Sequence, residues 1–98
     1  MTIQKIEDGS RLTIALEGRL DTTTSPELEA EWNKVKENVT DLVVDLEKLE
    51  YMSSAGLRVM LSMHNTMAGK GSLKVVHVNQ MIQEIFDITG FSSILDIE

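Results

Sequence analysis

Short apolar runs alternate with segments of helical periodicity along this chain, and few folds accommodate that alternation. Two apolar runs come first, and a repeated order of helix and strand follows to residue 98. Strands that alternate with helices usually pair in parallel through right-handed crossovers. We therefore expect one α/β domain over residues 1–98, in the order strand, strand, helix, strand, helix, strand, helix, strand. Its sheet should be mixed and mostly parallel, with an antiparallel hairpin at the N-terminus.

The hairpin is predicted over residues 3–17. Leu12, Ile14 and Leu16 alternate with more polar residues, which is typical of a half-buried strand. Asp8-Gly9 before them is a strong turn signal, and the first strand should lie at an edge of the sheet. Three further strands are expected at residues 41–46, 73–78 and 93–97. The first of these has the apolar, β-branched character of a buried central strand.

Helix start and stop signals separate these strands. Ser25 has the character of an N-cap with Pro26 at the first helical position, and Asn79 is a second candidate cap. Gly69 and Gly90 are candidate helix ends. The helices are expected to begin after Ser25, to span about residues 55–68, and to lie between Asn79 and Gly90. The remaining connections, residues 18–24 and the polar residues 47–50, are predicted to be loops.

Composition excludes several classes of function. The formal charge of −7 argues against a nucleic-acid binder, which normally carries a basic patch. The absence of Cys removes disulfides, thiol nucleophiles and zinc–thiolate sites. No signal peptide and no apolar run of membrane-spanning length is present, so we expect a soluble, cytoplasmic protein. No cofactor motif is found, and the histidines and carboxylates show no metal-ligand spacing.

Two serines, Ser53 and Ser54, precede the second predicted helix and are the main candidates for chemistry. A catalytic serine needs a base within reach, but His64 lies ten residues further along the same helix, about 15 Å away at 1.5 Å per residue. His77 lies between two valines of a predicted strand and is expected to be structural. No nucleophile-elbow motif occurs. We therefore expect that the protein is not an enzyme.

Ser54 can instead serve as a helix cap, as a phosphate acceptor, or as both. Ser is among the best N-cap residues. The free N–H groups and the dipole of a helix N-terminus also tolerate the roughly −1.5 to −2 charge of a phosphate. Such a modification should leave the fold intact and change the surface that a partner contacts. Ala55 and Gly56, being small, would let that partner approach closely.

The second predicted helix carries more apolar surface than one buried face requires. One stripe contains Leu57, Met60, Leu61, His64 and Ala68, and the second contains Val59, Met63 and Met67. Both stripes can be core if the helix packs between the sheet and another helix. Alternatively, one of them is an adaptable, methionine-containing contact surface.

Residues 51–61, Tyr51-Met52-Ser53-Ser54-Ala55-Gly56-Leu57-Arg58-Val59-Met60-Leu61, resemble the signature of bacterial anti-sigma factor antagonists, the STAS domains. Other segments resemble the family in the same order along nearly the whole chain: Gly18-Arg19-Leu20-Asp21 with Ser25-Pro26-Glu27-Leu28, then Leu42-Val43-Val44-Asp45-Leu46, and then residues 79–91. The resemblance implies a STAS-like α/β fold. Many members continue into a final helix, which is expected to be missing or vestigial here.

The resemblance also implies site residues. Alignment on Gly56-Leu57 places the phosphorylated serine of the family on Ser54, with Ser53 as the second choice. The family often has Asp before that serine and Ser or Thr after it, where this chain has Ser53 and Ala55. Asp21 matches an acidic loop residue near the phosphorylation site. The expected partner-binding residues are Asp21, Ser53, Ser54, Ala55, Gly56, Leu57, Val59 and Met63.

The partners that the resemblance implies are an anti-sigma factor, commonly a serine kinase, and a metal-dependent serine phosphatase. In the family, the unphosphorylated antagonist captures the anti-sigma factor and frees the sigma factor, and phosphorylation reverses this. A second possibility is a STAS interaction module of a sensory or lipid-transport complex without a phosphorylation switch. The pair of serines favours the first. A small hydrolase that uses Ser54 is a third possibility, but the motif offers it no base.

Overall fold

The structure, a computed structural model, describes all 98 residues and contains a five-stranded sheet with three α-helices. The elements in chain order are β1 (Thr2–Asp8), β2 (Arg11–Leu20), α1 (Ser25–Val35), β3 (Asp41–Met52), α2 (Ser54–Ala68), β4 (Ser72–Val76), α3 (Gln80–Thr89) and β5 (Asp96–Ile97), with short 3-10 turns at Lys36–Asn38 and Phe91–Ser93. The strand order in the sheet is β1-β2-β3-β4-β5. β1 and β2 pair antiparallel and all later pairs are parallel, so the expected α/β fold is confirmed.

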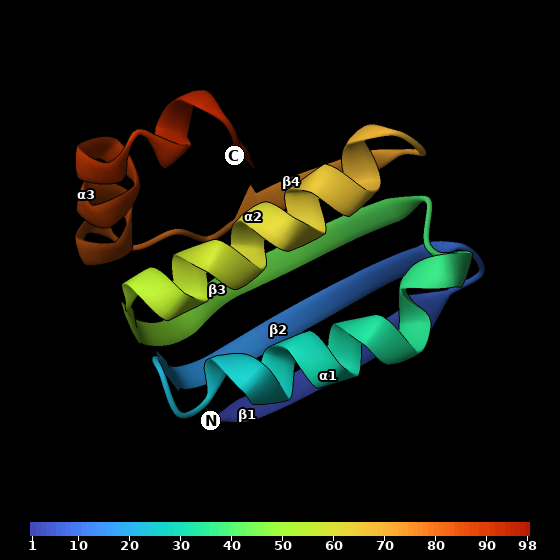
Figure 1. Ribbon diagram of the computed structural model, residues 1–98, viewed down its shortest axis with the longest axis horizontal. Helices are drawn as coiled ribbons and strands as arrows, with labels where there is room; N and C mark the ends of the chain where they lie inside the picture. Colours follow the sequence, from blue (N-terminus) through green and yellow to red (C-terminus); the bar gives the residue numbers. More distant parts are fainter.

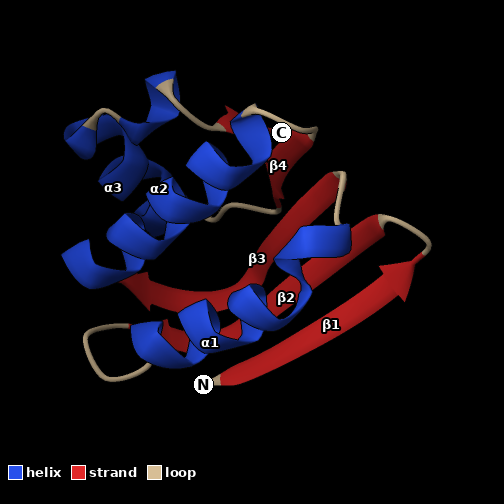
Figure 2. Cartoon of the chain, turned by 45° about the vertical axis from the view of Figure 1, so that its right-hand side comes forward, coloured by secondary structure: helices blue, strands red, loops and turns tan.

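The strand order explains why the molecule has two layers. From β2 onward each strand lies beside the previous one, always in the same direction across the sheet. Because crossovers between parallel strands are right-handed, successive helices then lie on one face of the sheet. Figures 1 and 2 show α1 over β1 and β2 and α2 over β3 and β4, on the same side. The other face of the sheet carries no helix.

The hairpin and the central strand agree with the sequence prediction. Gly9 has φ +64 in the turn between β1 and β2, where a glycine meets no steric penalty. The strand that begins at Asp41 lies in the middle of the sheet, as predicted. Two boundaries were wrong, because β2 continues to Leu20 and β3 continues through the polar residues 47–50 to Met52. Two irregularities in the pairing of β2 with β3 interrupt the alternation there and hide the strand pattern.

The last two strands are shorter than predicted. β4 ends at Val76, and His77 has a left-handed backbone with φ +58 that stops the strand. β5 is only Asp96–Ile97, because a 3-10 turn occupies the residues before it.

The helix boundaries confirm most of the predicted signals. The Asn79 side chain accepts a hydrogen bond from the Ile82 N–H at 2.9 Å, and Gly90 ends α3 with φ +83. Gly69 is the C-cap of α2. Ser25 is not a cap, however, because it lies inside α1, is buried, and has an Oγ without a hydrogen-bond partner. Thr24 takes the N-cap position, without a side-chain capping bond.

The helices and the sheet enclose one apolar core. Trp32 of α1, Met60 of α2 and Phe86 of α3 are among its largest fully buried side chains. The second stripe of α2 also belongs to this core, since Val59 is 6% exposed and Met63 is 0% exposed. Their predicted role as partner contacts was therefore wrong. The reason is that α2 packs on β3, β4 and α1 at once, which buries a wide arc of the helix.

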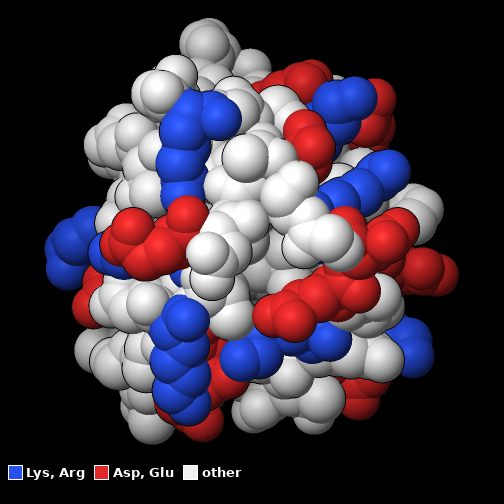
Figure 3. Space-filling view, turned by 90° about the vertical axis from the view of Figure 1, so that its right-hand side faces the viewer, with Lys and Arg blue, Asp and Glu red and all other residues white.

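Charged side chains of both signs share the surface. On the face in Figure 3, lysines and arginines lie among aspartates and glutamates rather than apart from them. No helix of the structure has the length and apolar character needed to cross a membrane.

Candidate functional site

The candidate site lies where β2 and β3 end and α2 begins. The Ser53 N–H donates a hydrogen bond to the Leu20 carbonyl oxygen at 2.9 Å, which joins the start of α2 to the end of β2. The Ser53 Oγ accepts a hydrogen bond from the Gly56 N–H at 3.4 Å, so Ser53 is the N-cap. Ser54 is the first residue of the helix and is exposed. The interpretation of Ser54 as the helix cap was therefore wrong, because its neighbour has that role.

Gly56 holds α2 close to the two strands. A Cβ atom at this position would lie 2.8 Å from the Leu20 Cγ and 3.0 Å from the Met52 Cγ. Gly56 is buried by these side chains. Its small size thus serves packing inside the domain rather than the approach of a partner, which corrects the prediction from sequence.

Asp21 organises the loop beside the helix. Its Oδ1 accepts hydrogen bonds from the backbone N–H groups of Thr23 at 3.0 Å and Thr24 at 3.1 Å. Donation by Thr24 is the main cause that lowers the pKa of the Asp21 carboxyl below its ordinary value, with help from Thr23. The Thr24 Oγ1 closes the turn, since it accepts from the Asp21 N–H at 2.9 Å and donates to the Arg19 carbonyl oxygen at 2.7 Å. Asp21 is thus an ionised residue on a loop with a defined shape.

A second contact joins this loop to the end of β3. The guanidinium carbon of Arg19 lies 4.4 Å from the centre of the Tyr51 ring, and Arg19 and Tyr51 are paired across β2 and β3. The Arg19 Nε also lies 4.0 Å from the Asp21 Oδ2. The carboxyl ends of two adjacent parallel strands therefore present the Asp21 loop and the Ser54 helix start at the same edge of the sheet, where open α/β sheets usually bind ligands.

A hollow of about 230 Å³ lies between the first turns of α1 and α2 and is lined in part by Ala55, the residue after Ser54. Its lining residues come from the loop and from both helices: Thr22, Ser25, Pro26, Glu29, Ala55, Arg58 and Val59. Arg58 is exposed and lies four residues after Ser54, on the same face of α2. Sequence reasoning missed Arg58 as a site residue, although the spacing from Ser54 was visible.

The predicted partner-binding residues separate into two groups. Ser54 is exposed, and Asp21, Ser53 and Ala55 are half-buried, so all four present atoms at the surface. The other four are buried: Gly56, Leu57, Val59 and Met63. A catalytic role for Ser54 gains no support from the histidines, because His64 lies along α2 and His77 is paired with Asp45.

Substitution of the two serines should separate their roles. We expect Ser53→Ala to lower the free energy of unfolding by about 0.5–1 kcal/mol, because the N-cap bond to the Gly56 N–H is lost. Ser54→Ala should change it by less than about 0.5 kcal/mol, because that side chain is exposed and makes no hydrogen bond within the protein. Urea denaturation of both variants measures this, and an equal loss in both would show that capping is shared.

Known proteins resemble the chain over almost its whole length. The family model described as "Mlab, STAS domain" matches residues 3–96. BtrV of Bordetella bronchiseptica, assigned as an anti-sigma factor antagonist, is 33% identical, and the alignment covers 99% of this chain and 84% of that protein. The anti-sigma-B factor antagonist of Bacillus subtilis is 30% identical, over 97% of this chain and 86% of that protein.

Solved structures share the fold. The anti-sigma factor antagonist SpoIIAA in its unphosphorylated form superposes with a TM-score of 0.78 at 18% identity, over 99% of this chain and 87% of that one. The Bacillus SpoIIAA structure in the phosphorylated form gives the same TM-score at 19% identity, over 99% and 91%. Together with the family match over residues 3–96, these likenesses show that the chain belongs to the STAS domain family.

Proposed function

We propose that this protein is an anti-sigma factor antagonist that acts in the cytoplasm and is switched by phosphorylation of Ser54. The unmodified protein binds an anti-sigma factor with serine kinase activity and so frees a sigma factor. The exposed Ser54 hydroxyl at the first position of α2 is the observation that carries this proposal. Two relatives are named anti-sigma factor antagonists, and SpoIIAA has been solved in a phosphorylated form, which supports it.

The surroundings favour Ser54 over Ser53 as the acceptor. Ser53 is half-buried and its Oγ accepts the capping bond, so a phosphate there would displace the cap. A phosphate on Ser54 stays in solvent and lies close to the free N–H groups of the first turn of α2. Arg58, one turn later, can approach it from the same face. Phosphorylation at Ser54 therefore keeps the domain folded.

The proposed partner surface consists of the accessible residues around Ser54, with the Asp21 loop on one side and Arg58 on the other. The hollow beside them can receive a side chain of the anti-sigma factor. A phosphate on Ser54 would add negative charge to a surface that already includes the ionised Asp21. The two residues are connected through the hydrogen bond from the Ser53 N–H to the carbonyl oxygen of Leu20, the residue before Asp21. Charge and bulk at this surface, rather than a change of fold, would then release the partner.

The acceptor is tested by incubation of the protein with the cognate kinase and ATP. We expect intact mass spectrometry to show one added phosphate on the wild type and on Ser53→Ala, and none on Ser54→Ala. A metal-dependent serine phosphatase should remove it. Peptide mapping that places the phosphate on Ser53 would mean that the alignment with the family is shifted by one residue.

The other candidate function is a STAS interaction module of a sensory or lipid-transport complex. It predicts stable partner binding without phosphate transfer. Protein that binds its partner but gains no mass with any kinase encoded beside it would favour this second function.

A further inference from the structure

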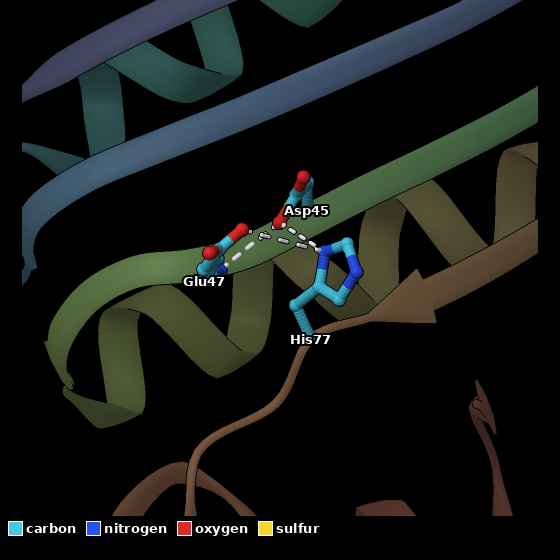
Figure 4. A group of neighbouring side chains, drawn as sticks. All are labelled: Asp45, Glu47 and His77. Atoms are coloured by element: carbon cyan, nitrogen blue, oxygen red, sulfur yellow. Dashed lines mark hydrogen bonds and ion pairs between the residues drawn. The ribbon is translucent and has the colours of Figure 1, made fainter.

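Three polar side chains gather on the helix-free side of the sheet, away from the start of α2. Asp45 and Glu47 belong to β3, and His77 follows the end of β4 (Figure 4). One ligand atom of each side chain can be chosen so that all three lie within 4.8 Å of one another. Figure 4 shows the imidazole directed toward both carboxylates.

The backbone explains why these residues meet. Asp45 and Glu47 are two positions apart on one strand, so both side chains leave the same face of the sheet. Asp45 is paired with Val76 of β4, which brings the next residue, His77, alongside. Strand alternation would direct His77 to the opposite face from Val76. Its left-handed backbone, φ +58, breaks that alternation and lets the ring reach Asp45.

The distances suit a small divalent ion. The His77 Nδ1 lies 3.0 Å from the Asp45 Oδ1 and 3.9 Å from the Glu47 Oε2. Ligand atoms bound to Zn²⁺ at about 2.0–2.2 Å lie about 3–3.5 Å from one another. Small rotations of the side chains would therefore bring all three ligand atoms to binding distance from one ion. The Glu47 N–H donates to the Asp45 Oδ1 at 3.0 Å and holds that carboxylate in place, as groups behind metal ligands commonly do.

The charge and the setting also favour a cation. Two carboxylates face one imidazole in this cluster. Lys48, the residue after Glu47, forms an ion pair with Glu17 at 3.8 Å. A hollow of about 270 Å³ on the helix-free face includes Asp45 and Glu47 in its lining and leaves room for water to complete the coordination shell.

We propose that Asp45, Glu47 and His77 form a binding site for a divalent transition-metal ion such as Zn²⁺. One imidazole nitrogen and two carboxylate oxygens supply the protein ligands, and water supplies the rest. The ion would join the middle of β3 to the connection between β4 and α3. That connection already forms one hydrogen bond to β3, in which the Asn79 Nδ2 donates to the Leu49 carbonyl oxygen at 2.8 Å. Metal binding would therefore hold α3 more firmly on the sheet.

Titration of tag-free, chelator-treated protein with Zn²⁺ in a calorimeter tests the site. We expect one ion per chain, with affinity lowered at least about tenfold in His77→Asn and in Asp45→Asn. Asn at position 77 tolerates the left-handed backbone, and Asn at position 45 still accepts the Glu47 N–H, so both variants should fold. His64→Asn is the matched control, because it removes the other histidine of the chain, and its affinity should equal that of the wild type.

Backbone amide NMR spectra locate the ion. Zn²⁺ should shift the signals of residues 45–48 and 76–79 and leave those of residues 53–58 in place. Undiminished binding by His77→Asn, an equal loss in His64→Asn, or shifts confined to other residues would each overturn the proposal. Because the cluster is separate from Ser54, this outcome is independent of the phosphorylation experiment.

Discussion

Ser54→Asp is expected to fold like the unmodified protein and to bind the anti-sigma factor at least about thirtyfold more weakly, which corresponds to about 2 kcal/mol of binding free energy. The carboxylate would stand at the exposed first position of α2, where it meets a partner in the complex. An uncompensated charge enclosed in an interface typically costs 2–5 kcal/mol. In the free protein the same charge lies at a helix N-terminus, a favourable position for an anion. Calorimetric titration measures the affinity, and thermal unfolding measures the fold.

A matched control distinguishes the position of the charge from its presence. Ser62 is also exposed on α2, two turns beyond Ser54. Ser62→Asp adds the same charge and should bind the anti-sigma factor as tightly as the wild type. Loss of the cooperative melting transition in Ser54→Asp would show instead that a negative charge at this position disrupts the domain.

Met63→Ala is expected to lower the free energy of unfolding by about 2–5 kcal/mol. Met63 is 0% exposed and lies on the side of α2 that joins the apolar core. Truncation to Ala removes buried contacts and leaves a cavity that the helix can only partly close. Urea denaturation gives the free energy of unfolding of the variant and of the wild type.

Met81 provides the comparison for Met63, because it is 54% exposed on α3. Met81→Ala should change the free energy of unfolding by less than about 0.5 kcal/mol. A Met63→Ala protein that keeps its stability and loses partner affinity would return the second stripe of α2 to the partner surface.

The sequence predicted the order and type of every element, because hydrophobic periodicity and the start and stop signals agreed with one another. The ends of β2 and β3 could not be predicted in the same way. Residues 47–50 have a polar appearance, yet Leu49 is buried, because an extra residue in the pairing shifts the side that faces the core. Such an irregularity depends on the neighbouring strand and leaves no regular pattern in the sequence.

The sequence placed Ser53 and Ser54 at the start of α2, where the structure has them, but it did not reveal the separate roles of these and the neighbouring residues. Ser53 and Ser54 are both suitable caps by residue type, and only the backbone distinguishes the one that accepts the Gly56 N–H. Position 56 requires a glycine because Leu20, far away in the sequence, packs against it. The second stripe of α2 was ambiguous for a similar reason, since its burial depends on where α1 lies.

The sequence also could not predict the cluster of Asp45, Glu47 and His77, which depends on contacts between distant segments. The spacing of Asp45 and Glu47 predicts that both lie on one face of a strand, but His77 is thirty residues further on. Its approach depends on the parallel register of β3 and β4 and on a left-handed residue where no glycine marks one. Ligand spacing along the sequence could not reveal it.

The most direct test is the affinity of the anti-sigma factor for the protein before and after phosphorylation by its kinase, measured by titration of both forms with the same partner preparation. We predict that the unmodified protein binds, that the protein phosphorylated on Ser54 binds at least about thirtyfold more weakly, and that phosphatase treatment restores the first value. Equal affinity of the two forms, with the phosphate mapped to Ser54, would contradict the proposed switch.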